Sequence, residues 1–139
     1  MIGSNMSLIA RISLVASIIL ASSTLHARNE ERARADYINY CAACHGVDGT
    51  GNGPMAGELK GAPTDLTTLT KNNEGHFPYI QIRKVIDGSL STGSIRAHGS
   101  AEMPVWGDVF RRQGGDTSKW NDAQARIMNI VDYLSTIQK

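Results

Sequence analysis

The sequence CAACH occupies residues 41–45, and the interpretation of the whole chain starts from it. Cysteines three positions apart on a helical turn, here Cys41 and Cys44, face the same side. Their sulfurs can each form a thioether with one vinyl group of a haem. The histidine that follows, His45, is then carried under the iron and can serve as its proximal ligand. The spacing therefore predicts one covalently attached haem.

Two other uses of the paired cysteines stay open. A thiol redox pair shares the C-x-x-C spacing but belongs in a strand-to-helix context, and no strand pattern precedes Cys41. A zinc site needs four ligands, and His76 and His98 could complete one with Cys41 and Cys44, although the usual paired spacing is missing. A structural disulfide is a poor explanation, because so short a loop would constrain the unfolded chain little.

A second axial ligand for the iron is expected from AEMPVWG at residues 101–107. Met103 lies in a predicted loop directly before Pro104, which restricts the backbone of Met103 to extended conformations. This restriction suits a thioether ligand that needs a defined approach to the iron. His98 is the main alternative ligand, because imidazole also binds iron well, and His76 is a further one.

The remaining sequence predicts an all-α domain with long loops and no convincing strand. An N-cap at Asn29 and acids after it start the first predicted helix. Pro78 and Gly88 suit the start and the end of another helix. Asn121 is expected to cap the last helix, which carries one continuous apolar stripe. The predicted helices span residues 30–44, 78–87, 105–112 and about 121–137, with a short turn of helix near 55–59.

A glycine-rich loop runs from residue 46 to residue 63, where six of 18 residues are glycine. Its DGTGNG at 48–53 begins like a calcium-binding loop, but Leu59 stands where that loop requires glutamate, so the calcium interpretation fails. We expect the glycines to let the backbone pass close to a haem edge. Loops this long are expected to be held in place by a bound group.

The N-terminus is predicted to be a secretory signal over residues 1–27, followed by a single domain at 28–139. Arg11 precedes a nine-residue apolar run, small residues follow the run, and Ala27 is the expected cleavage point. A retained membrane anchor is the alternative, but the apolar stretch is shorter than the ~20 residues that a span requires.

The composition fits one folded domain, because apolar residues make up 41% and charged residues 19% of 139. Removal of residues 1–27 takes away Arg11 and no acid, which leaves equal numbers of basic and acidic side chains. A neutral balance favours neither a nucleic-acid partner nor a strongly anionic membrane surface.

Three segments together resemble the class I monohaem cytochromes c of bacterial periplasmic type. They are CAACHGVDGTGNG at 41–53, GAPTDLT at 61–67 and AHGSAEMPVWG at 97–107. The resemblance extends over essentially the whole chain after the signal. It implies the all-α cytochrome c fold, with about four to five helices and long loops around one haem, and with the first and last helices crossing beside it.

The resemblance also implies a site. Pro63 is similar to the loop proline whose carbonyl accepts the N–H of the proximal histidine, and Trp106 is similar in place to a residue that lines the haem edge. Arg83 and Arg96 are available to cover the haem propionates. The thioether positions and the proximal and distal iron ligands would be the residues already singled out: Cys41, Cys44, His45 and Met103.

The expected function is single-electron transfer by one haem c in a periplasmic or respiratory chain, with redox proteins as donor and acceptor. Two strong axial ligands leave no open position on the iron, so no enzymatic activity is expected. The chain would act as a monomer or as a subunit of a redox complex. Two alternatives stay open: a dedicated cytochrome subunit of a dehydrogenase or oxidase, and a haem-based sensor or enzyme from which Met103 is displaced.

Overall fold

The computed structural model describes residues 26–89, 103–113 and 119–139. The chain divides into two units, Met1–Glu31 and Arg32–Lys139, and the second contains α2 to α5 and every residue of the cavity described below. Only residues 26 and 27 of the expected signal are described. His98 and Arg96 lie outside the described residues. The predictions that concern them therefore stay predictions.

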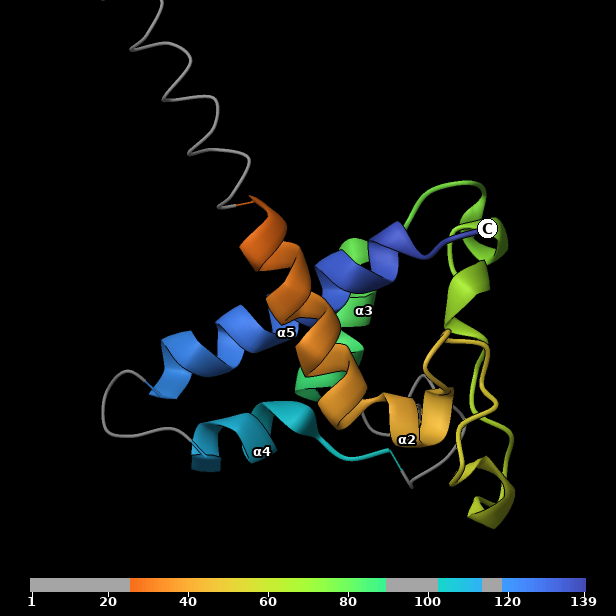
Figure 1. Cartoon of the computed structure of the whole chain (residues 1–139), viewed down its shortest axis with the longest axis horizontal. Coiled ribbons are helices and arrows are strands. Elements are labelled where there is room, and N and C mark those ends of the chain that lie inside the picture. Colours follow the sequence, from red (N-terminus) through yellow and green to blue (C-terminus); the bar gives the residue numbers. More distant parts are fainter. Residues whose placement is uncertain (1–25, 90–102, 114–118) are drawn as a thin grey trace, which may run out of the picture. The chain divides into compact units, whose positions relative to one another are not determined.

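The regular elements of the described residues are all helical, which confirms the predicted all-α class (Figure 1). None of residues 26–89, 103–113 and 119–139 lies in a strand. Three turns of 3-10 helix punctuate the loops at Ala56–Glu58, Leu66–Thr68 and Lys71–Asn73. The α-helices are an N-terminal helix at 26–40, α2 Ala42–His45, α3 Tyr79–Asp87, α4 Trp106–Gln113 and α5 Lys119–Thr136.

The N-terminal helix differs from its prediction at both ends. It includes the first described residue, 26, so Asn29 lies inside it and the predicted N-cap there is wrong. Within the Met1–Glu31 unit, His26 pairs with Glu30 one turn later at 3.2 Å, which favours helix before Asn29. At the other end, Cys41 (φ −118°) interrupts the helix, and α2 follows as a separate short helix at Ala42–His45.

The core is built on α5. Its buried stripe is at most 2% exposed and packs against α3 and α4. Figure 1 shows the N-terminal helix crossing α5, and the rings of Tyr37 and Tyr133 lie 4.9 Å apart at this contact. Asn129 also donates a hydrogen bond to Asp36 at 3.3 Å. The expected contact between the first and last helices is therefore present. The stripe consists of Ala123, Ile127, Ile130, Val131 and Leu134.

Two further helix starts shift slightly from their predictions. α3 begins at Tyr79, and Pro78 precedes it as the N-cap, while Gly88 ends the helix in the left-handed conformation (φ 84°) as predicted. α5 begins at Lys119, so Asn121 is not its cap. Among the described residues, no helix is long and apolar enough to cross a membrane.

Candidate functional site

One cavity brings together the six side chains that the sequence singled out. It lies between the end of the N-terminal helix, α2, the loop at 59–64 and the segment at 103–106, and its volume is about 320 Å³. Pockets that hold small molecules and cofactors typically measure about 300–1,000 Å³. The predicted residues that line it are Cys41, Cys44, His45, Pro63, Met103 and Trp106.

The two cysteines are free thiols and form no disulfide. Cys41 is 9% exposed, and burial raises the pKa of its thiol to about 12, with the nearby carboxylate of Asp36 and the Cys44 sulfur adding to the rise. The thiol of Cys41 is therefore protonated at neutral pH. Cys44 is half-buried in the cavity wall. The site thus presents two reduced sulfurs, as thioether formation requires.

His45 ends α2 and is 9% exposed. Its Nδ1 lies 3.1 Å from the carbonyl oxygen of Thr64, which can only accept, so Nδ1 carries the proton in this contact. Burial lowers the pKa of the imidazole, and the hydrogen bond to Thr64 opposes that shift. In a neutral ring that donates from Nδ1, the basic lone pair is on Nε2, the atom through which an imidazole can bind a metal ion.

The identity of the acceptor corrects one prediction, because the resemblance pointed to the carbonyl of Pro63. The Pro63 carbonyl oxygen instead faces Gly51, where a Cβ atom would lie only 2.4 Å from it. Gly51 has a positive φ of 86° and donates its N–H to the carbonyl of His45 at 2.8 Å. Pro63 therefore lines the cavity, and the carbonyl of the next residue, Thr64, receives the hydrogen bond.

Several glycines of the loop make close backbone contacts outside the cavity. None of the glycines at 46, 49, 51 and 53 lines the cavity. Gly53 lies against α2, where a Cβ atom would approach the carbonyl oxygens of Ala42 and Ala43 at 2.6 and 2.4 Å. Gly53 therefore allows the loop to pack against α2, which carries His45, while Gly61 near the end of the same loop lines the cavity.

Met103 and Trp106 reach the cavity from a part of the chain remote in sequence from α2. Met103 is half-buried and packs against the core. Trp106 begins α4, and its ring stacks on Phe110 at 5.5 Å and meets the edge of Tyr40 at 5.4 Å. The start of α4 thereby fixes the indole in the cavity wall.

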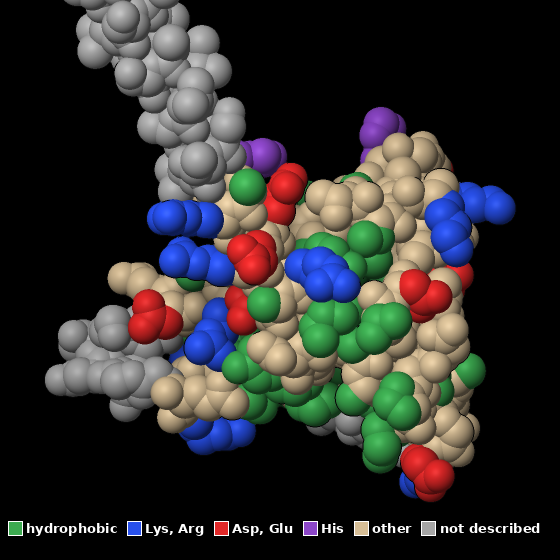
Figure 2. Space-filling model, viewed as in Figure 1, with side chains coloured by type: hydrophobic (Ala, Val, Ile, Leu, Met, Phe, Trp, Pro, Cys, Tyr) green, Lys and Arg blue, Asp and Glu red, His purple; other side chains and the backbone are tan. Residues whose placement is uncertain are grey.

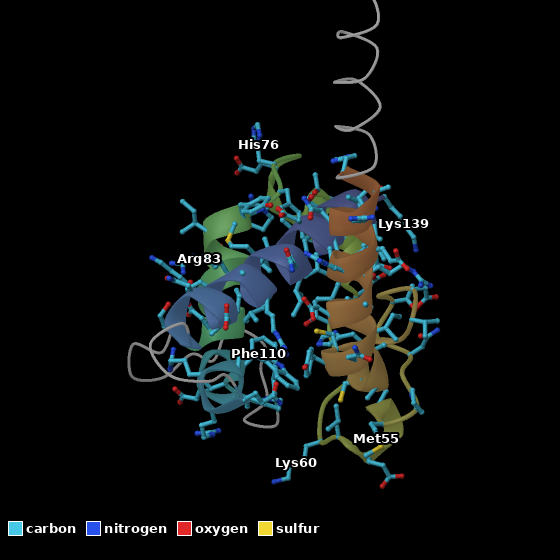
Figure 3. All side chains as sticks on the ribbon, turned by 60° about the vertical axis from the view of Figure 1, so that its left-hand side comes forward. Met55, Lys60, His76, Arg83, Phe110 and Lys139 are labelled. Atoms are coloured by element: carbon cyan, nitrogen blue, oxygen red, sulfur yellow. The ribbon has the colours of Figure 1, made fainter. Side chains whose placement is uncertain are left out.

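Two further residues that the sequence analysis named, His76 and Arg83, lie within the described residues, and neither lines the cavity. His76 is exposed and does not line the cavity, and Figure 3 shows it at the end of the molecule away from Lys60, which adjoins the lining residues Leu59 and Gly61. Arg83, named as available to cover the propionates, contacts Asp87 at 3.2 Å and Gln124 at 3.0 Å, which joins α3 to α5. In the part of the chain that the structure describes, no three His, Cys, Asp or Glu side chains gather around a possible metal position.

Sequence reasoning missed two contributors to the site. Thr64 is the acceptor for His45, and no sequence signal distinguishes it from Pro63 beside it. Tyr40 lines the cavity, and Arg126 of α5 donates to its hydroxyl at 2.5 Å while lying over its ring at 5.6 Å. The position of Tyr40 directly before Cys41 could have indicated the cavity, but its partner Arg126 is 86 residues away.

The donor set suits one kind of bound group. Two reduced thiols, one neutral imidazole and one thioether line a single cavity whose remaining walls are largely apolar or aromatic. A covalently attached haem requires two thiols for its vinyl groups and can take a nitrogen and a sulfur ligand on iron. The residues present therefore fit a haem.

Comparison with known proteins gives one family. The sequence model of the family described as Cytochrome c matches residues 31–138, which include every residue that lines the cavity. No curated protein and no solved structure matches the sequence significantly.

Proposed function

The chain belongs to the cytochrome c family, whose members use haem c for electron transfer, and from this premise we propose a specific carrier. The protein holds one haem c, attached covalently through Cys41 and Cys44 and ligated by His45 and Met103. It exchanges single electrons with redox proteins and performs no reaction on a substrate. Family membership supports the haem and the electron transfer; the number of haems, the attachment and the ligands are our proposal.

One observation carries the proposal: both thiols, the imidazole and the thioether line the same cavity, although Met103 comes from a remote segment. When bound, haem supplies an iron that cycles between the ferric and ferrous states. His45 donates its Nδ1 proton to Thr64, which fixes the ring and increases its basicity. Met103 offers a thioether, which favours ferrous iron and raises the reduction potential.

The partner contact is proposed to be brief and to use the surface near α2. Figure 2 shows hydrophobic side chains gathered over the end of the N-terminal helix and α2. Val47, which follows α2 closely, is 68% exposed, and Met55 is 48% exposed. Small contact areas are typical of electron-transfer complexes, because they must form and separate rapidly.

Export of the protein is part of the same proposal. We keep residues 1–27 as a secretory signal and 28–139 as the cytochrome domain of a periplasmic protein. Arg11, the apolar run after it and Ala27 support this assignment.

An absorption spectrum tests the ligands. The protein is produced in a bacterial host that exports it and attaches haem, and Met103→Ala is compared with Met55→Ala, whose methionine lies outside the cavity lining. We expect the sulfur-to-iron charge-transfer band of the ferric protein to vanish only in Met103→Ala, which also gains binding of carbon monoxide when reduced. His98→Ala should leave the band unchanged.

Three results would contradict the proposal. Loss of the native spectrum in His98→Ala would transfer the sixth ligand to that residue. Ready binding of carbon monoxide by the unaltered ferrous protein would favour a sensor with a displaceable Met103. A colourless purified protein would remove the haem from the account altogether.

A further inference from the structure

We propose that Gln138 is a positioning residue for His45. It fixes the segment that carries Thr64, and so controls the hydrogen bond from the imidazole Nδ1–H to the Thr64 carbonyl. The inference rests on the proposed function, because it takes His45 as the proximal ligand of the iron. Gln138 does not itself line the cavity, and its effect passes through backbone hydrogen bonds.

Both the nitrogen and the oxygen of the Gln138 side-chain amide form hydrogen bonds. Its Nε2 donates to the carbonyls of Leu66 at 2.8 Å and Leu134 at 2.7 Å, and its Oε1 accepts from the N–H of Thr70 at 2.9 Å. An amide nitrogen has two hydrogens to donate, so both donors of Gln138 are engaged. One side chain therefore joins the last turn of α5 to both ends of the segment 66–70.

The residues on either side of Gln138 strengthen this attachment. The N–H of Lys139 donates to the carbonyl of Thr67 at 2.9 Å. Ile137 lies against Gly49, where a Cβ atom would be 2.8 Å from its Cδ1. Figure 1 shows the C-terminus beside the yellow-green segment, the part of the chain to which Thr67 belongs. The end of the chain thus contacts the loops on both sides of the cavity-lining segment.

Hydrogen bonds connect the segment 66–70 to His45. Thr64 lies two residues before Leu66, and its carbonyl is the acceptor of the Nδ1 hydrogen bond at 3.1 Å. The N–H of Leu66 donates to Gly49 at 2.7 Å, and that of Gly51 donates to the carbonyl of His45 at 2.8 Å. The side chain of Thr64 is exposed, so apolar burial does not hold its carbonyl in place. Backbone hydrogen bonds hold the Thr64 carbonyl in place, and Gln138 anchors the segment that forms them.

The expected consequence has a definite sign. A hydrogen bond from Nδ1 increases the basicity of a metal-bound imidazole and so favours the ferric state. A loosened Thr64 segment weakens that bond, so the reduction potential should rise. The Nδ1 proton of His45 should also exchange faster with solvent, by about fivefold to tenfold for the loss of one ordinary hydrogen bond.

The test compares Gln138→Met with Gln124→Met in the haem-loaded protein. Methionine has a similar length to glutamine, carries no charge and cannot replace the amide contacts. Gln124 is a matched control, since it also belongs to the α5 region but accepts a hydrogen bond from Arg83 at 3.0 Å, away from the 64–70 segment. Gln138→Asn retains the amide on a shorter side chain and gives a milder variant in case Gln138→Met folds poorly.

Two readouts are measured: the midpoint potential, and the solvent exchange of the His45 Nδ1–H and the Thr70 N–H by NMR. We expect a higher potential and faster exchange at both sites in Gln138→Met, smaller changes of the same sign in Gln138→Asn, and none in Gln124→Met. A Gln138→Met protein with faster exchange at Thr70 but an unaltered potential and an unaltered His45 proton would overturn the inference and leave the proposed function intact. If the protein without substitutions carried no haem, or had another proximal ligand, both the inference and the proposed function would be overturned.

Discussion

The α5 core face and the loop from residue 46 to residue 70 are ordered by different forces. The α5 stripe is at most 2% exposed and gains its stability from apolar burial. The loop holds one buried hydrophobic side chain, Leu66, and depends on backbone hydrogen bonds, glycines and the C-terminal contacts. Burial thus positions the helices, whereas hydrogen bonds position the acceptor of His45.

Tyr37 joins the two regions. Its ring is fully buried against Tyr133 of α5, and its hydroxyl donates to the carbonyl of Gly46 at 2.6 Å, just after α2. Burial raises the pKa of this hydroxyl far above its ordinary value, so it stays protonated and able to donate. The helix crossing therefore also fixes the start of the loop.

The largest expected effect comes from the core. Ile130→Ala leaves a cavity in a fully buried position, and we expect a loss of about 2–5 kcal/mol in the free energy of unfolding, measured by urea titration. Ile80→Ala is the control, since Ile80 is 69% exposed and should change stability by less than about 0.5 kcal/mol. Equal losses in the two variants would contradict the assignment of the core.

An intermediate effect is expected where the loop meets α2. Gly53→Ala forces a Cβ atom against the carbonyls of Ala42 and Ala43, and these are backbone atoms that cannot rotate away. We expect a loss of about 1–3 kcal/mol by urea titration, together with a perturbed haem spectrum, because α2 carries His45. Gly57→Ala meets no atom within 4 Å and should leave both measurements unchanged. A silent Gly53→Ala would show that the close packing against α2 is not required.

The smallest expected effect concerns pH. Asp65 accepts hydrogen bonds from the hydroxyl of Thr67 at 2.6 Å and from its N–H at 2.9 Å, and these lower the pKa of the carboxyl. A lowered folded-state pKa stabilises the protein above the unfolded pKa of about 3.9, and this stabilisation is lost as pH falls through the folded value. The stability difference between the unaltered protein and Asp65→Asn should therefore shrink between pH 6 and about pH 3. A difference that stays constant over this range would refute the role of the charged carboxylate.

The same contrast explains what could be predicted from the sequence. Apolar periodicity found the α5 stripe and the apolar face of α3, because burial repeats with the helical period. The C-x-x-C-H spacing is local, so the sequence alone indicated three of the cavity residues. Met103, Pro63 and Trp106 came from a proline-bounded loop and a family resemblance, and the structure brings them to the same cavity.

What the sequence did not show depends on backbone direction and on distant contacts. The choice between the carbonyls of Pro63 and Thr64 follows from one peptide orientation beside Gly51. The roles of Arg126 at Tyr40 and of Gln138 at Leu66 join residues 86 and 72 positions apart. The start of the N-terminal helix shifted as well, because a local pair between His26 and Glu30 favours helix before the predicted cap.

The central claim is tested most directly by the intact mass of the denatured protein after treatment with a thiol-alkylating reagent. The full chain is produced in a host that exports it and attaches haem. We predict a mass equal to the processed chain plus one haem, with neither Cys41 nor Cys44 alkylated. A mass without haem, and with both cysteines alkylated, would contradict the account.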